Sequence, residues 1–300
     1  MIENVAATLV SQDFGTWSRA DIERIVAGAG WSIGDEEEYS VPIETGGVGH
    51  ARSMKRHYGQ DGFGYGEHTD LQIEQSCPAD QLEARYAATL AAVISVLGPP
   101  ALVGGPDAWT FWRNPRVRLA RDIRRTEVTL RVEPAEPAEA EEYSNAEWSE
   151  GWEPEHLWNA EPDLTSDAEK SLIGMLFHDA GPAQTWDQFE RSLRNLFASF
   201  AADIPTLAAY TPHVGWQITP ASAGRFVNGR FTPDGVELGS DDPGIETELP
   251  PGPDSGRRIA EIALTAIRGW GLASPAQLRY RCRVPRPGRL SAKSGFRIPL

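Results

Sequence analysis

The chain has few cysteines, no long hydrophobic run, and far fewer basic than acidic residues. Its 300 residues include two cysteines, Cys77 and Cys282, which are too few for a disulfide framework. We therefore expect free thiols and a reducing, cytoplasmic location. No apolar run reaches the roughly eighteen residues of a membrane-spanning helix, and the N-terminal stretch lacks the basic region and apolar core of a signal peptide. These absences predict a protein without a membrane partner.

The shortage of basic residues limits the classes of partner. With 28 lysines and arginines against 43 aspartates and glutamates, the formal net charge is −15. Proteins that bind nucleic acid or anionic lipid neutralise phosphates with lysine and arginine, and a strongly acidic surface repels both. Nucleic acid is therefore not an expected partner, whereas neutral or basic proteins and small molecules are.

Short motifs of well-known catalytic and cofactor sites are also missing. The chain has no H-E-x-x-H, no paired-cysteine metal spacing, no P-loop and no G-x-S-x-G. Cys77 precedes Pro78 at an expected helix start, where a helix N-terminus can lower the pKa of a thiol. Cys77 is thus the one candidate nucleophile, and an incidental cysteine is the alternative. No cofactor is predicted.

The residues that are present favour folded structure. Apolar residues make up 40% of the chain and ten residues are tryptophan, which is enough for hydrophobic cores. A length of 300 residues suits two ordinary domains.

The first part of the chain has the pattern of an α+β unit over residues 1–135. Ser18 and Asp21 form a capping-box pattern before an apolar helical face, and residues 82–97 carry the clearest amphipathic helix, which Gly98 ends. Short alternating segments surround these helices and predict strands at residues 38–43, 52–58, 63–66, 70–75, 108–112, 117–122 and 128–132. This order predicts an antiparallel sheet packed with two helices.

Residues 166–300 have the pattern of a second such unit. Thr185 and Gln188 form another capping box before an apolar face, and residues 259–270 form a further amphipathic helix. Between them, Asn228-Gly229 is a favoured hairpin turn and residues 234–254 have the composition of an exposed acidic loop. The basic C-terminal stretch predicts a strand whose outward face carries Arg279 and Arg281. Because similar landmarks recur at a near-constant offset, we predict two similar units related by a divergent internal repeat.

An acidic segment separates the two predicted units. Residues 133–155 contain nine glutamates and no lysine or arginine, with repeated proline and alanine, so residues 136–165 are predicted to be a solvated linker. Aromatic residues lie among these acids and favour an interface with a basic protein. The candidate partner-binding residues, which we call the acidic aromatic strip, are Glu141, Glu142, Trp148, Glu150, Trp152 and Trp158. The alternative is that the aromatic rings cover a sheet of their own domain.

Histidines near one another in the first unit are the densest set of possible metal ligands. These candidates are His50, His57, His68 and Asp70. They favour a metal-assisted hydrolase as the alternative function, although no metal-binding spacing is present. Exposed strand and turn residues are the other explanation of this set.

Several landmarks of the first unit are similar to a known family. They are Gly30-Trp31, Gly62-Phe63-Gly64-Tyr65-Gly66, Leu97-Gly98-Pro99-Pro100, Trp112 and Val128–Val132. Residues 15–135 resemble a bacterial domain family of unknown function linked to toxin and immunity genes, whose element order is similar to the type III secretion chaperone-like fold. This resemblance implies a non-enzymatic protein that binds and masks another protein, as an immunity protein or a secretion chaperone does, and it supplies no catalytic residues.

Overall fold

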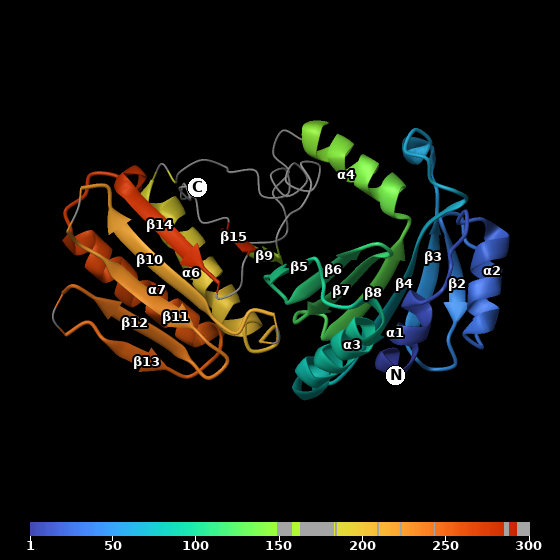
Figure 1. Ribbon diagram of the computed structural model, residues 1–300, viewed down its shortest axis with the longest axis horizontal. Coiled ribbons are helices and arrows are strands. Elements are labelled where there is room, and N and C mark those ends of the chain that lie inside the picture. The colour runs from blue at the N-terminus through green and yellow to red at the C-terminus, as the bar shows by residue number, and fades with distance from the viewer. Residues whose placement is uncertain are drawn as a thin grey trace. The chain divides into compact units, whose positions relative to one another are not determined.

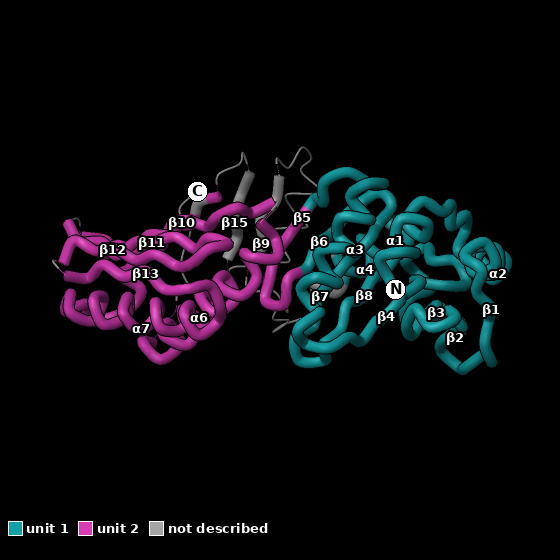
Figure 2. Tube along the Cα trace, turned by 90° about the horizontal axis from the view of Figure 1, so that it is seen from below, with its two compact units in different colours: residues 1–101, 109–152 teal, residues 102–108, 153–300 magenta. Residues whose placement is uncertain are grey.

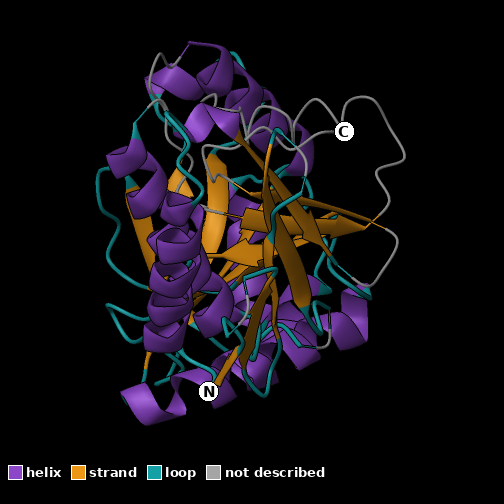
Figure 3. Cartoon of the chain, turned by 90° about the vertical axis from the view of Figure 1, so that its left-hand side faces the viewer, coloured by secondary structure: helices purple, strands orange, loops and turns teal. Residues whose placement is uncertain are grey.

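The computed structural model describes residues 1–148, 158–162, 183, 185–208, 210–222, 224–242, 244–284 and 288–292. The chain folds into two compact units (Figure 2): unit 1 comprises residues 1–101 and 109–152, and unit 2 comprises residues 102–108 and 153–300. Helices and antiparallel sheets both contribute (Figures 1 and 3), so the α+β class is confirmed. Within the described part of the chain, no helix combines the length and the hydropathy needed to cross a membrane.

Unit 1 is built around one antiparallel sheet. Its helices are α1 (Ile2–Val10), α2 (Arg19–Gly28), α3 (Leu82–Leu97) and α4 (Ala135–Trp148), with single turns η1 (Tyr58–Gln60) and η2 (Ala79–Gln81). Its strands are β1 (Ser32–Ile33), β2 (Ser40–Glu44), β3 (His50–Lys55), β4 (His68–Ser76), β6 (Trp109–Arg113), β7 (Arg116–Asp122) and β8 (Glu127–Glu133). They pair in the order β1-β2-β3-β4-β8-β7-β6.

Local signals place the helices of unit 1 where the sequence predicts them. Ser18 accepts a hydrogen bond from the Asp21 N–H while the Asp21 carboxylate accepts from the Ser18 backbone, which confirms the capping box. Gly98 ends α3 with a φ of 74°, in the region that favours glycine. Tyr86, Leu90 and Val93 of α3 are buried and form part of the core on one face of the sheet. The first helix, α1, was not among the sequence expectations.

The acidic segment after β8 begins as a helix, so the predicted linker is not confirmed. Residues 135–148 form α4, directly after the last residue of β8. Among its described side chains only Ala138 is fully buried. Glutamate and alanine are good helix formers, and Pro137 falls in the first turn, where proline is tolerated. Composition alone therefore could not distinguish a solvated linker from a helix resting on the sheet.

Unit 2 contains a five-stranded antiparallel sheet and a separate three-stranded ribbon. Its helices are α6 (Trp186–Asp203) and α7 (Pro253–Gly269), with the single turn η3 (Pro275–Gln277). The main sheet has the order β13-β12-β11-β10-β14 and comprises β10 (Val214–Pro220), β11 (Val227–Phe231), β12 (Val236–Ser240), β13 (Thr247–Leu249) and β14 (Leu278–Arg283). The ribbon pairs β5 (Leu102–Gly105), β9 (Trp158–Pro162) and β15 (Gly288–Ala292) in that order.

Both helices of unit 2 lie on the same face of the main sheet (Figures 1 and 2). Aromatic side chains fill the space between them and the strands: the Phe197 ring lies 4.5 Å from the Trp216 ring and 5.1 Å from the Phe231 ring, centroid to centroid. Such pairs add to the free energy of burial. The other face of the sheet is not covered by a helix of the described part of this unit.

The predicted hairpin turn at Asn228-Gly229 and the predicted acidic loop at residues 234–254 were wrong. Asn228 and Gly229 lie within β11, where a Cβ on Gly229 would sit 2.1 Å from the Glu237 carbonyl oxygen and 2.7 Å from the Trp216 ring. Glycine is needed there for close packing and not for a turn. The predicted acidic loop at residues 234–254 contains β12 and β13.

Residues 63–66, predicted as a strand, form turns instead. Gly64 has a φ of 85°, which an extended strand does not allow. Gly62 and Gly66, each two residues from Gly64, give this stretch further backbone freedom to bend before β4.

The internal repeat is not confirmed. Each unit contains a helix, four strands and a helix in this order: α2, β1 to β4 and α3 in unit 1, and α6, β10 to β13 and α7 in unit 2. The strands that follow α3 and α7 pair differently. In unit 1, β8 pairs with β4, the last of the four strands, whereas in unit 2, β14 pairs with β10, the first of the four. The two sheets thus differ in topology.

Candidate functional site

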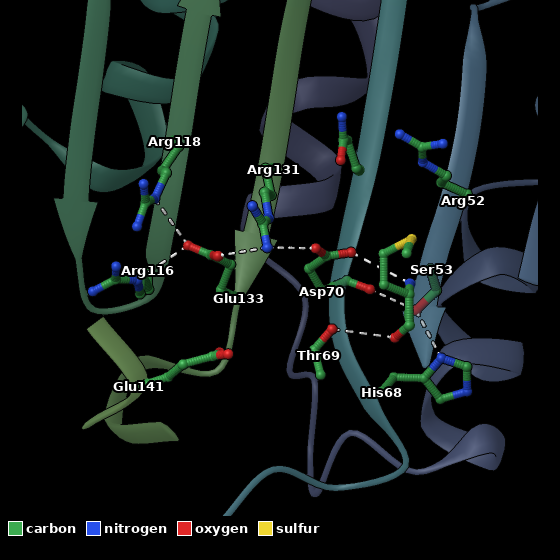
Figure 4. Close-up of polar contacts among 12 residues, drawn as sticks. Arg52, Ser53, His68, Thr69, Asp70, Arg116, Arg118, Arg131, Glu133 and Glu141 are labelled. Carbon is green, nitrogen blue, oxygen red and sulfur yellow. Dashed lines mark hydrogen bonds and ion pairs between the residues drawn. The ribbon is translucent and has the colours of Figure 1, made fainter. Parts of the chain in front are cut away.

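Alternation in β7 and β8 builds a charged face on the sheet of unit 1. Val117, Leu119, Val128, Leu130 and Val132 are buried on the core side. Because successive strand residues point to opposite faces, the residues between them lie on the other side. Figure 4 shows Arg116, Arg118 and Arg131 there, gathered around Glu133. We call these three residues the arginine cluster.

Glu133 is the centre of this charged face. Its Oε2 atom accepts from Arg116 Nε and Arg118 Nε, each at 3.1 Å, and its Oε1 atom pairs with Arg131 at 3.0 Å. The Glu133 side chain is 5% exposed and that of Arg116 is 1% exposed. Burial alone would raise the pKa of Glu133, but the combined positive charge of the three arginines holds this pKa below its usual value. Glu133 is therefore a buried carboxylate whose charged form is stabilised by its neighbours.

Asp70 extends the network onto β4. Its carboxylate pairs with Arg131 at 2.7 Å and accepts from the Met54 N–H at 3.3 Å. Burial raises the pKa of Asp70 despite the lowering effect of Arg131, and the nearby charge of Glu133 acts in the same direction as burial. The two buried acids thus have pKa shifts of opposite sign.

The predicted metal ligands are not gathered into one site. His68 is 2% exposed, and its Nδ1 atom lies 2.9 Å from Ser53 Oγ, which donates to the Asp70 carbonyl oxygen at 2.6 Å. His50 is exposed on β3, and His57 caps η1 by accepting from the Gly59 N–H. Among the described residues, no group of three or more histidines, cysteines or acids could hold a metal ion.

His68 has the burial expected of a structural histidine. Burial lowers its pKa, and the charge of Arg19 adds to this effect. The imidazole is therefore predominantly neutral at pH 7. Ser53 is fully buried, so its hydroxyl is not available to a substrate.

Two carboxylates of the acidic aromatic strip contact unit 1 itself. Glu142 pairs with Arg116 Nη2 at 2.5 Å and also with Arg118. Glu141 accepts from Tyr65 Oη at 2.7 Å, and burial followed by this contact raises the pKa of Tyr65 well above its usual value. Glu142 therefore neutralises positive charge of its own unit, and Glu141 accepts a hydrogen bond within the same unit.

Trp158, another residue of the strip, is buried in unit 2. Its ring packs against Phe200 at 5.3 Å, and its Nε1 atom donates to Ser199 Oγ at 2.9 Å. Trp158 is therefore a core residue of unit 2, and its side chain is not exposed to a partner protein. Trp148 is the last residue of α4, while Glu150 and Trp152 lie outside the described residues.

Both thiols are free, and neither has the lowered pKa of a nucleophile. Burial raises the pKa of Cys77, even though Arg85 is near, so the lowering by a helix start that the sequence suggested does not occur. Burial raises the pKa of Cys282 to about 12.

Unit 2 presents a groove on the face of its main sheet that lies opposite α6 and α7. The groove has a volume of about 810 Å³, within the range of ligand sites. Gly215 and Gly239 contribute no side chains to its lining. Most of the lining is polar and includes Gln217, Asn228, Arg230, Glu237, Glu246, Thr247, Glu248 and Arg281.

Charges of opposite sign lie at the two sides of this groove. Arg279 and Arg281 are exposed on β14 and alternate with the buried Leu278 and Tyr280, in agreement with the basic outward face predicted for this strand. Of the two arginines, Arg281 lines the groove. Glu246 and Glu248 are exposed at the β13 side. Between them, Arg230 forms a bidentate pair with Glu237, at 2.7 Å from Nη2 to Oε1.

Sequence reasoning missed the arginine cluster although a signal was present. Arg118 and Arg131 alternate with valine and leucine in predicted strands, and Arg116 directly precedes one of these strands, so their shared face could have been inferred. Their proximity to Glu133 and Asp70 depends on the pairing of β4 with β8 and β8 with β7, which no local pattern specifies.

No family model matches this chain, and no curated protein or solved structure gives a match to it. Function is therefore argued from the contacts of the chain alone.

Proposed function

We propose that the protein binds another protein without catalysing a reaction, by holding an extended segment of it on the open face of the unit 2 sheet. The observation that carries this proposal is the 810 Å³ groove on a sheet face that α6 and α7 leave uncovered (Figure 1). An antiparallel sheet can have one face in water, but a hollowed face with charges of both signs also offers complementarity to a partner.

The chemistry of the groove defines the segment that fits. Arg281 would pair with its acidic residues, and Glu246 and Glu248 with its basic residues. Gln217 and Asn228 supply hydrogen-bonding side chains between these two sides. The segment is therefore extended and carries both charges. Masking such a partner, as an immunity protein or a secretion chaperone does, is the biological role we propose.

The test is a selection from a library of extended peptides displayed on phage. Peptides with adjacent acidic and basic groups should bind the wild-type protein. The double variant Glu248→Arg/Arg281→Glu reverses the polarity of the groove, so it should select peptides with the reverse order of charges. Selection of the same peptides by both proteins, or of none by either, would contradict the proposal.

A matched control lies on the other side of the same unit. Arg191 is exposed on α6, which covers the opposite face of the sheet. The Arg191→Glu variant has a charge reversal like that of Arg281→Glu but should select the same peptides as the wild type. Altered selection by this variant would show that net charge, and not the groove, determines binding.

A further inference from the structure

The arginine cluster of unit 1 is incompletely neutralised by its own sheet. Three guanidinium groups, from Arg116, Arg118 and Arg131, face two sheet carboxylates, those of Glu133 and Asp70. The cluster therefore carries one positive charge more than the two sheet carboxylates neutralise, and Arg116, whose side chain is 1% exposed, is the buried charge that most requires a further carboxylate. In this structure α4 supplies it.

The contact with α4 leaves part of the cluster unsatisfied. Glu142 pairs with Arg116 Nη2 at 2.5 Å and with Arg118. Arg116 Nη1 lies 3.8 Å from Glu139, which is too far for a hydrogen bond, and among the residues that the structure describes this buried atom has no hydrogen-bond partner. The Phe111 ring lies 4.9 Å from the Arg116 guanidinium carbon, a cation–π contact that holds this group in place. A rigid, buried cation with an unused donor therefore faces α4.

The described part of α4 is attached mainly by its charges. Ala138 is the one buried side chain in this part of the helix, and its polar contacts with the rest of unit 1 come from Glu139, Glu141 and Glu142. The described side chains of α4 therefore form no apolar stripe of the kind that fixes a helix to a core. Because it is joined directly to β8, it stays near the cluster at a high effective concentration.

We propose that the arginine cluster is a binding site for an acidic segment of another protein, and that α4 occupies it as the competitor built into the chain. A segment with two carboxylates three residues apart reproduces the contacts that Glu139 and Glu142 make. Binding requires α4 to leave, so the apparent affinity is the intrinsic affinity reduced by the fraction of molecules in which the site is open. This proposal concerns unit 1 and does not depend on the groove of unit 2.

The experiment uses the full chain and a fluorescein-labelled peptide with the sequence of residues 135–148, measured by fluorescence anisotropy. The peptide should bind the Glu142→Gln variant about tenfold more tightly than the wild type, because the tethered helix has lost its main contact with the arginines. Glu136→Gln removes the same charge from an exposed position of α4 that makes no polar contact among the described residues, so this variant should bind the peptide with the affinity of the wild type. Equal affinities of the Glu142→Gln and Glu136→Gln variants would overturn the proposal.

Two further measurements identify the site and the ligand. Arg118 is 36% exposed, so Arg118→Gln should fold, and the double variant Arg118→Gln/Glu142→Gln should lose the gain in affinity. If circular dichroism shows that this variant is unfolded, Arg118→Lys/Glu142→Gln replaces it, since lysine cannot form the forked contact. Retention of the gain places the peptide elsewhere. Inorganic phosphate at matched ionic strength should displace the peptide only at far higher concentration than unlabelled peptide, whereas displacement at equal concentration would assign the cluster to a small anion and refute the acidic segment.

Discussion

The polar faces of the two main sheets use their charges differently. In unit 1, Arg116 and Glu133 pair in a buried position, with side chains 1% and 5% exposed. In unit 2, Arg230 and Glu237 pair with good bidentate geometry, yet their side chains are 49% and 43% exposed. Both pairs bridge neighbouring antiparallel strands, β7 with β8 and β11 with β12. The environment of the two pairs differs far more than their geometry.

This difference shows what determines how much an ion pair on a sheet face contributes to stability. Alternation within a strand determines which residues lie on the face, and it does so equally in both units. Whether those residues are buried depends on their surroundings, which in unit 1 include α4. Removing one partner of a buried pair leaves an uncompensated charge inside the protein and lowers stability strongly. When one partner of an exposed pair is removed, water solvates the other partner, and stability changes little.

The largest expected effect is at Glu133. We expect Glu133→Ala to lower the free energy of unfolding of unit 1 by about 3–5 kcal/mol, because it leaves Arg116 buried without its main carboxylate. Urea denaturation measures the loss, and hydrogen exchange in β7 and β8 assigns it to unit 1. Glu136→Ala, at an exposed position, should change stability by less than about 0.5 kcal/mol. A loss at Glu133 no larger than this control would mean that the network is solvated and would remove the contrast between the sheets.

The next effect is a pH dependence of opposite sign at the two buried acids. The pKa of Glu133 in the folded protein is below its usual 4.5, so its contribution to stability is present above pH 4.5 and is lost as the pH falls through the folded value. The pKa of Asp70 is raised above its usual 3.8, so its contribution is present below pH 3.8 and is lost as the pH rises through the folded value.

Two isosteric variants separate these contributions. As the pH rises from 3 to 7, Glu133→Gln should become less stable relative to the wild type, and Asp70→Asn should become more stable relative to it. Denaturation at several pH values checks both. If the stability difference from the wild type changed with pH in the same direction for both variants, the two acids would not have pKa shifts of opposite sign.

The sequence predicted local structure in this region better than it predicted the site. The alternation of Val128, Leu130 and Val132 correctly indicated a strand, and the capping boxes at Ser18 and Thr185 are confirmed. These features depend on neighbours within a few residues. The site depends on the pairing of β4 with β8, whose residues are far apart in the sequence, and this pairing brings Asp70 to Arg131.

Composition misled the interpretation of the acidic segment for a related reason. Glutamates without nearby bases in the sequence favour a solvated chain, and Glu141 and Glu142 were therefore assigned to a partner surface. Their counter-charges and donors come from β7, from η1 and from Tyr65, which are distant in the sequence. Gly229 shows the same limit, because a glycine next to asparagine is typical of a turn unless a ring from another strand packs against it.

The smallest expected effect is at the exposed pair, Arg230 and Glu237. In a double-mutant cycle with Arg230→Ala and Glu237→Ala, we expect a coupling energy below about 1 kcal/mol, because solvent competes for both groups. This coupling should fall further in about 1 M salt, where the Debye length is close to 3 Å. The matching cycle on Arg131 and Asp70 should keep most of its coupling in the same salt, since Asp70 is buried. A strong, salt-insensitive coupling between Arg230 and Glu237 would indicate that this face is already covered in solution, in which case the groove could not receive a partner and the two sheets would be alike.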